Sequence, residues 1–218
     1  MQIEAAVERG FQCRPDVAAA VATRARLHMF TARSTIIWQG ETLTHAYLLI
    51  DGEAHEMMLA ANGQELLLQV HGAGALLGER GLVDAAEAPA SVIAVKPSAS
   101  AGFAIADFIA LMQQHGCIGL AVSRAMIARA SAMAHKMAAM SLLSATGRIC
   151  AELARRGRAS PDGVLRPVPV WSELARDVNS TRETVSRTIA DLKRRGIVRQ
   201  DDGALVIVAP RLLDDLVV

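Results

Sequence analysis

The residues best suited to bind another molecule lie in one stretch near the C-terminus, at positions 171–197, which reads WSELARDVNSTRETVSRTIADLKRRGI. Its second half has the apolar spacing of a helix, with Val185, Ile189 and Leu192 on one side. The polar side chains of the opposite side are Arg182, Glu183, Ser186 and Arg187. Arginine can donate two hydrogen bonds to the edge of guanine, and glutamate can accept one from cytosine. This pattern favours an exposed helix whose first two turns read DNA bases.

The residues before this helix predict a second, shorter helix and a tight turn between the two. Positions 173–178 suit a short helix with Leu174 on its inner face. Asn179 tolerates the left-handed backbone that such a turn needs. Ser180 is predicted as the N-cap of the second helix, with Glu183 three residues on completing a capping box. Together these elements predict a helix-turn-helix.

The residues around the second helix fit the same interpretation. Ser180, Thr181 and the free N–H groups at the start of the helix can hold a phosphate. After the helix, positions 197–199 and 204–208 flank the turn Asp201-Asp202-Gly203 and predict a β-hairpin. A hairpin at this place is the wing of a winged helix. The arginines taken singly could merely solvate a helix, but that explanation does not account for two helices at this spacing followed by a wing.

Charge is distributed unevenly along the 218 residues, although the formal net charge is only +1. Residues 1–139 carry 10 Lys and Arg against 12 Asp and Glu, whereas residues 140–218 carry 13 against 10. The segment 182–199 alone holds 6 basic and 2 acidic residues. A basic segment on a nearly neutral chain is what localised contact with phosphates requires.

The middle of the N-terminal half has the pattern of an antiparallel β-structure. Short apolar runs occur at 36–38, 46–50, 66–70 and 91–95 and alternate with glycine-containing turns. This spacing predicts a small barrel or sandwich, and Asn62-Gly63 predicts a hairpin. Residues 16–30 are expected to form one short helix before it.

From about Ala106 the apolar period becomes helical. An apolar seam with alternating spacings of four and three residues is typical of a two-stranded coiled coil. Its members are Met126, Ala130, Met133, Met137 and Met140. The seam predicts a homodimer, the alternative being that the methionines pack on the chain's own barrel. A further helix is expected at 144–158.

These motifs resemble those of the CRP/FNR family of bacterial transcription regulators from about residue 30 onward. STRETVSR at 180–187 is similar to the family's recognition-helix motif, and ATGRI at 145–149 resembles the hinge after its dimer helix. AYLLIDGEA at 46–54 and LLGERGL at 76–82 resemble its barrel strand and the start of its phosphate-binding cassette.

The resemblance implies an α+β fold in three parts. Residues 1–112 would form a sensory β-barrel of the cyclic-nucleotide-binding type (a jelly roll, or double-stranded β-helix) with an N-terminal helix. Residues 113–142 would form the dimerisation helix, and residues 143–218 a winged helix-turn-helix.

The resemblance also implies a role for individual residues. Arg182, Glu183 and Arg187 would read a TGTGA-like half-site in each half of a palindrome. Thr181, Thr184 and Thr146 would contact phosphates. At Val170 the family often has a hydroxyl cap, so this departure weakens the expected start of the first helix of the motif.

The effector pocket departs further from the family pattern. Gly78 and Glu79 match the cassette, but Pro89-Ala90 stands where the family's cyclic-AMP binders carry an Arg-Ser pair. Proline has neither a charge nor an N–H, so it cannot replace a guanidinium. Met133 and Ala134 occupy the positions that bind adenine in those relatives. We therefore expect no response to cyclic AMP.

Several uses of the barrel stay open at this point. The protein could act without an effector, or bind a cyclic dinucleotide or an apolar metabolite. A haem or redox sensor is a further alternative, with His71 or the pair His115 and Cys117 as ligands. An iron–sulfur cluster needs four cysteines, and this sequence has three.

Other function classes have little support. No phosphate loop, zinc motif or GxSxG is present, so we expect neither an enzyme nor a bound metal or cofactor. The scattered Cys13, Cys117 and Cys150 predict free thiols. A helix-turn-helix that binds protein instead of DNA is the remaining alternative. The N-terminus does not read as a signal peptide, and the uncharged stretch 108–123 is too short to span a bilayer. The expected setting is the cytoplasm, with double-stranded DNA and a second copy of the chain as partners. RNA polymerase and a small-molecule effector are left open.

Overall fold

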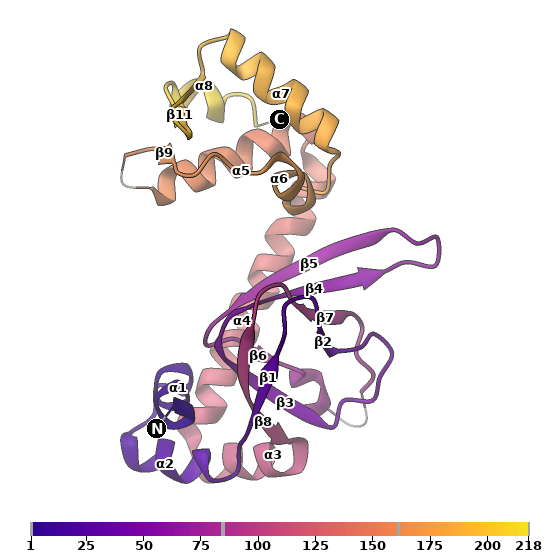
Figure 1. Ribbon diagram of the computed structural model, residues 1–218, viewed down its shortest axis with the longest axis vertical. Helices are drawn as coiled ribbons and strands as arrows, with labels where there is room; N and C mark the ends of the chain where they lie inside the picture. Colours follow the sequence, from indigo (N-terminus) through magenta and orange to yellow (C-terminus); the bar gives the residue numbers. More distant parts are fainter. Residues whose placement is uncertain (1, 84–85, 161, 218) are drawn as a thin grey trace. The chain divides into compact units, whose positions relative to one another are not determined.

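The computed structural model describes residues 2–83, 86–160 and 162–217. The chain divides into two compact units, Met1–Ala130 and Ser131–Val218. Each unit is described by itself below, and its elements can be followed along the chain in Figure 1.

The described part of the first unit is a β-structure flanked by helices. In chain order its elements are α1 (Gln2–Phe11), α2 (Pro15–Ala22), β1 (Arg26–Phe30), β2 (Thr35–Ile37), β3 (His45–Asp51), β4 (Glu53–Leu59), β5 (Glu65–Gly72), β6 (Leu76–Leu77), the 3₁₀ helix η1 (Glu79–Leu82), β7 (Ser91–Ala94), β8 (Ser98–Ala104) and α3 (Ile105–Gln114). The long helix α4 (Gly116–Leu142) begins in this unit and continues into the second.

The strands form two four-stranded antiparallel sheets, in the orders β1-β8-β3-β6 and β2-β7-β4-β5. This is the β-domain that the sequence pattern indicates, and all four apolar runs that predict strands lie in it. The hairpin expected at Asn62-Gly63 joins β4 to β5.

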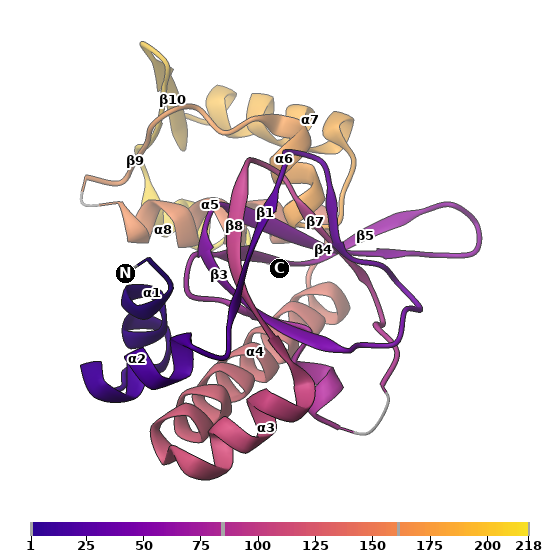
Figure 2. The same cartoon turned by 60° about the horizontal axis from the view of Figure 1, so that its bottom comes forward.

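Strand β3 shows how the sequence separates two hydrophobic cores. Successive side chains of a strand point to opposite faces. Ala46 and Leu48 therefore pack into a core shared with α1, α2, α3 and α4, whereas Tyr47 packs against a second core with Ile37 and Val92. Figure 2 shows α1 and α2 beside each other near the N-terminus. Each face of the sheet that contains β3 thus packs into its own core. The core shared with the helices holds the start of α4 against this sheet.

The second unit is a small helical domain with a three-stranded sheet. Its described elements after α4 are α5 (Ala145–Ala159), β9 (Val164–Leu165), α6 (Trp171–Asp177), α7 (Arg182–Arg194), β10 (Val198–Asp201), β11 (Ala204–Ile207) and α8 (Pro210–Asp214). The sheet has the order β10-β11-β9. The predicted helix-turn-helix is α6 and α7, and the predicted wing is the β10–β11 hairpin.

The expectation of one helix over residues 16–30 is wrong. A helix ends at Ala22, and residues 26–30 form β1, which pairs along its length with β8. The helix at residues 2–11 was not expected. Leu27 and Met29 fit a helical stripe and an exposed strand equally well, so the pairing with β8 decides their conformation.

Strand β8 was not expected from the amino-acid sequence. Its sequence, SASAGFA, consists mostly of small residues with weak β propensity, yet six of its seven residues are buried. A Cβ built on Gly102 would lie 2.7 Å from the His28 ring of the neighbouring strand. Close packing against the neighbouring strand selects small residues there, and a single sequence does not show which strands will lie side by side.

Candidate nucleic-acid interface and ligand pocket

Helix α7 separates its apolar and polar residues as its sequence predicts. Val185, Ile189 and Leu192 are buried in the core of the second unit. The side chains predicted to read bases, Arg182, Glu183 and Arg187, are exposed, and so is Ser186. An array of two arginines and a glutamate therefore faces solvent from the first two turns of a helix that is fixed by its other side.

The predicted N-cap of this helix is off by one residue. Thr181, not Ser180, is the N-cap, and its hydroxyl accepts a hydrogen bond from the backbone N–H of Thr184 at 3.2 Å. Ser180 instead donates its backbone N–H to Ala175 O at 2.8 Å. That bond makes Ser180 part of the turn that ends α6. The N-cap of α7 is therefore the next residue, Thr181. The capping box between Ser180 and Glu183 is therefore not formed.

The turn between α6 and α7 is held by a residue outside the motif. Asn179 has the left-handed backbone expected of it, with a φ of 48°. Arg148 of α5 donates from Nε to Val178 O at 2.9 Å and from Nη2 to Asn179 O at 3.1 Å. Arg148 also donates to Leu143 O at 3.0 Å. One guanidinium thereby joins the start of α5 to the turn that positions the exposed helix.

The predicted phosphate contacts gather around α7. Thr146, Thr184 and Arg187 line one open groove of about 620 Å³. Arg182 lines a different groove, together with Gln200 of the wing and the residues just before α6. Thr146 and Thr184 are 38 positions apart in the sequence, and the fold places both on one surface with a base-reading candidate.

Glu183 remains a hydrogen-bond acceptor at neutral pH. Its pKa is lowered because its carboxylate accepts hydrogen bonds from its own backbone N–H and from the Thr181 hydroxyl. The start of α6 differs from this arrangement, since Val170 occupies its N-cap position without a side-chain hydrogen bond. The missing cap expected at Val170 is thus confirmed.

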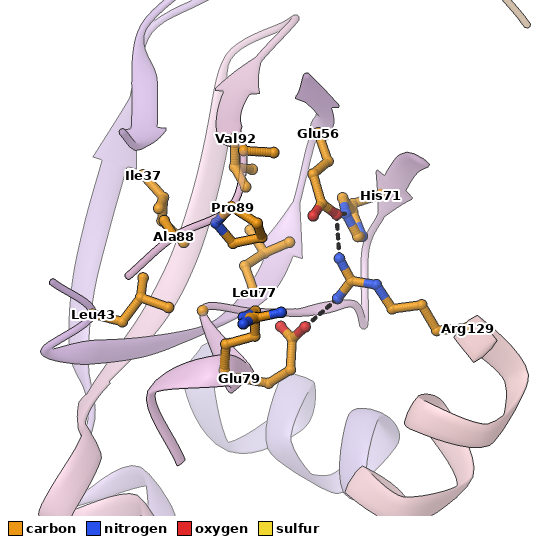
Figure 3. A pocket seen from close by; sticks show the side chains of 13 residues that line it. Ile37, Leu43, Glu56, His71, Leu77, Glu79, Ala88, Pro89, Val92 and Arg129 are labelled. Carbon is orange, nitrogen blue, oxygen red and sulfur yellow. Dashed lines mark hydrogen bonds and ion pairs between the residues drawn. The ribbon is translucent and has the colours of Figure 1, made fainter. Parts of the chain in front are cut away.

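A separate pocket lies in the first unit, and it includes four of the predicted effector residues. They are Gly78, Glu79, Pro89 and Ala90. Gly78 has a φ of +74°, and a Cβ there would lie 2.6 Å from His45 O, so only glycine fits at this turn. The turn starts η1 and directs the Glu79 side chain into the pocket (Figure 3).

The pocket is occupied by the chain's own Arg129. Its Nη1 donates to Glu79 Oε1 and its Nη2 to Glu56 Oε2, as Figure 3 shows. His71 lies behind Glu56, with its Nε2 at 3.0 Å from Glu56 Oε2. The free space left between the lining side chains is about 20 Å³. That volume suits one water molecule and is far too small for a nucleotide.

Glu56 stays ionised despite its burial. Burial alone would raise the pKa of its carboxyl group, but the hydrogen bond with His71 and the positive charge of Arg129 outweigh it and lower the pKa. His71 itself is buried, and its Nε2 is engaged with Glu56. Among the described residues, no group of three or more His, Cys, Asp or Glu side chains is placed to hold a metal ion.

Comparison with known proteins matches both units. The cyclic nucleotide-binding domain family matches residues 27–115, and the Crp-like helix-turn-helix domain family matches residues 147–216. The chain belongs to the CRP/FNR family of transcription regulators. The cyclic AMP receptor protein of Thermus thermophilus is 27% identical over 183 residues, which are 83% of this chain and 83% of that relative.

Two solved structures show the likeness of fold. A CooA mutant from Carboxydothermus hydrogenoformans matches with a TM-score of 0.78 and 16% identity, covering 91% of this chain and 90% of the other. The c-di-GMP responsive global regulator CLP of Xanthomonas campestris matches with a TM-score of 0.70 and 19% identity, covering 89% and 99%. The CRP/FNR architecture of a β-domain, a long helix and a winged helix-turn-helix is therefore present.

Other residues predicted for the CRP/FNR effector pocket and dimer seam lie along α4. Met133 and Ala134 are in the second unit and are exposed. Met137 and Met140 are exposed as well, and the amide of Asn179 lies 3.3 Å from the Met140 sulfur. Met126 differs, because it packs against the core of the first unit. The alternative of packing on the chain's own barrel therefore applies to Met126.

Helix α4 is also long and apolar enough, by length and composition, to cross a membrane. Only 11% of the relevant window is buried. The expectation from sequence had weighed only residues 108–123 as a possible membrane span. Ile127, exposed beside the seam, is an apolar residue that sequence reasoning missed.

Sequence reasoning also missed two of the three side chains that fill the pocket beside Glu79. Glu56 and Arg129 were not among the predicted pocket residues, and His71 was considered only as a haem ligand. Strand alternation offers one signal, since Glu56 lies two residues from the fully buried Ala54 and so faces the same interior. No local pattern links it to Arg129, 73 residues later.

Proposed function

We propose that this CRP/FNR protein is a homodimeric regulator that binds a palindromic DNA site through α7, without control by cyclic AMP. The observation that carries the proposal is the exposed set Arg182, Glu183 and Arg187 on the first two turns of α7. The opposite face of that helix is buried, so the backbone positions from which the three side chains project are fixed. Such rigid presentation is what reading of base edges in the major groove requires.

The chemistry of these residues supports a TGTGA-like half-site. Each arginine can pair with guanine O6 and N7, and the ionised Glu183 can accept from cytosine N4. Thr181, Thr184 and Thr146, with Ser180 and Ser186, would bind the phosphates that set the helix in register. We place the DNA-binding domain at residues 143–218.

We further propose that residues 113–142 serve as the dimerisation helix. The exposed methionines at positions 133, 137 and 140, with Ala130, form a seam that a second copy would bury. A membrane span is the less favoured use of α4, because Arg124, Arg129 and Lys136 lie along it and Arg129 is ion-paired within the β-domain. The setting we propose is the cytoplasm, with RNA polymerase left open as a partner and no catalytic role.

Independence of cyclic AMP is supported by the pocket that Arg129 occupies. Pro89 lines it without a charge or an N–H, and two carboxylates face its interior. A cyclic phosphate placed there would be repelled by the carboxylates of Glu56 and Glu79. It could pair with Arg129 only by breaking the ion pairs of Arg129 with both. A cyclic dinucleotide carries phosphates too and meets the same obstacle, although a relative from Xanthomonas responds to c-di-GMP.

The test is fluorescence anisotropy of the purified protein on a palindromic probe with two TGTGA half-sites, with and without cyclic AMP. We expect binding without nucleotide that the nucleotide leaves unchanged. Affinity should fall steeply as salt rises, because phosphate contacts release counterions. Binding only after cyclic AMP or c-di-GMP is added would overturn the effector-free proposal. Absence of binding both here and in a selection from random DNA would overturn DNA recognition itself.

A further inference from the structure

We propose that the pocket of the first unit is a guanidinium-binding site whose ligand is the chain's own Arg129. The proposal goes beyond regulation of DNA binding, since it names the chemical class that the pocket accepts. It involves only residues of the first unit, and it holds or fails independently of any contact with DNA.

The geometry of the three partners matches a guanidinium. This group is planar and presents its N–H donors in a fixed fork. Each of the two terminal nitrogens of Arg129 faces a different carboxylate, one on η1 and one on β4. The side chains of Arg129, Glu56 and Glu79 are only 17%, 11% and 11% exposed. An ammonium would have to reach both carboxylates from a single nitrogen, whereas the guanidinium offers each carboxylate a separate nitrogen in a fixed plane.

The two acidic partners of Arg129 are positioned by different neighbours. His71 holds Glu56 by a hydrogen bond and is itself 3% exposed, which orients the carboxylate toward Arg129. Glu79 follows Gly78, whose left-handed backbone directs the start of η1. The guanidinium therefore lies between one carboxylate that His71 holds and one that the turn at Gly78 places.

Charge excludes an anion as the natural occupant. Glu56 and Glu79 need a cation nearby, because a buried carboxylate without a partner is costly. Arg80 also lines the pocket, and its side chain is exposed. An anionic ligand would have to draw Arg129 away and leave both carboxylates unpaired.

The small free space of the pocket also favours a guanidinium as its ligand. With Arg129 in place, the free space of about 20 Å³ admits no more than a water molecule. Shortening Arg129 to alanine would open a space of the shape of its own head group. Guanidinium and methylguanidine are the small cations that reproduce this head group.

The experiment is chemical rescue of the full-length Arg129→Ala variant, followed by thermal unfolding without DNA. We expect its unfolding temperature to be about 10 °C below that of the wild type, since two buried carboxylates lose their partner. Guanidinium chloride or methylguanidine at about 1 to 50 mM should restore at least half of that loss and then saturate. Urea, a neutral molecule of the same shape, and potassium chloride at matched ionic strength should restore none.

A second variant separates binding from a general effect of the salts. In Arg129→Ala combined with Glu56→Gln and Glu79→Gln, guanidinium should have no effect, and the protein should be more stable than Arg129→Ala alone. Equal rescue of both variants, or no rescue of either, overturns the proposal. Should Arg129→Ala fail to fold, folding of the triple variant supports the proposal and its failure overturns it.

Discussion

Arg182 is exposed at the first turn of α7 and lines a groove beside the wing. We expect Arg182→Ala to lose about 1 to 3 kcal/mol of binding free energy to the best site and to relax the preference at one base pair, since a bidentate contact to guanine is removed. Anisotropy titrations with the palindrome and its single-base variants measure both effects.

The matched control is Arg158→Ala. Arg158 is an exposed arginine of the same domain that pairs with Asp214 on the surface. It should leave the base preference unchanged. If Arg182→Ala behaved like this control, α7 would not read bases through Arg182.

Glu56 is a single residue whose ionisation contributes to the stability of the first unit. Its pKa lies below the ordinary value of 4.5, because His71 and Arg129 outweigh the effect of burial. A lowered folded-state pKa means that the stabilisation is present above 4.5 and is lost as the pH falls through the lower folded value. We therefore expect the wild type to lose stability more steeply than Glu56→Gln below about pH 4.5.

Thermal unfolding of both proteins across the acid range measures this difference. Glu65→Gln, an exposed change on β5, should follow the wild-type curve. Parallel curves for the wild type and Glu56→Gln would show that the carboxylate is not coupled to folding.

At the scale of elements, the start of α7 depends on Thr181 and not on Ser180. The Thr181 hydroxyl accepts from the N–H of Thr184, whereas the hydroxyl of Ser180 caps nothing in the contacts of this turn. We expect Thr181→Ala to lower the free energy of unfolding by about 1 kcal/mol, a usual value for an N-cap. Ser180→Ala should cost clearly less in the same urea titration. If Ser180→Ala lowered the free energy of unfolding more than Thr181→Ala, Ser180 would be the N-cap, as the capping-box pattern had indicated.

The turn before α7 gives the same element a second support. Arg148 bonds three backbone carbonyls, those of Leu143, Val178 and Asn179. Carbonyls at the end of a helix otherwise lack partners. The ATGRI segment that resembles the family hinge thus supplies the side chain that fixes the recognition motif to α5.

At the scale of the whole molecule, the exposed apolar seam of α4 implies a second copy. Met137 is 71% exposed, an unusual state for a methionine on a long helix with exposed apolar neighbours. We expect Met137→Glu to be monomeric and to lose most of its affinity for the palindrome, since two carboxylates would face each other across the seam. Sedimentation velocity and the anisotropy assay measure the two effects.

The control for this change is Val83→Glu, because Val83 is equally exposed but lies in the β-domain. It should remain dimeric. A dimeric Met137→Glu that still binds the palindrome would place the dimer contact elsewhere on the chain.

The amino-acid sequence by itself determined the helix-turn-helix, the wing and the exposed side chains that we propose to read bases. Their pattern is local, because residues three or four apart on one helix must share a face. The hairpin at Asn62-Gly63 and the four apolar strands are local too, because they depend on a two-residue turn and on short runs of neighbouring residues. Sequence also identified the departure at Pro89-Ala90, since it depends on residue type alone.

Tertiary structure decided the remainder. It made residues 26–30 a strand by pairing them with β8, and it moved the N-cap from Ser180 to Thr181 by using the Ser180 N–H to close α6. It also filled the pocket with Arg129, held by Glu56 and Glu79. Those residues come from three elements distant in sequence, and their contact is selected by the cost of burying charge without a partner, which acts only once the chain has folded.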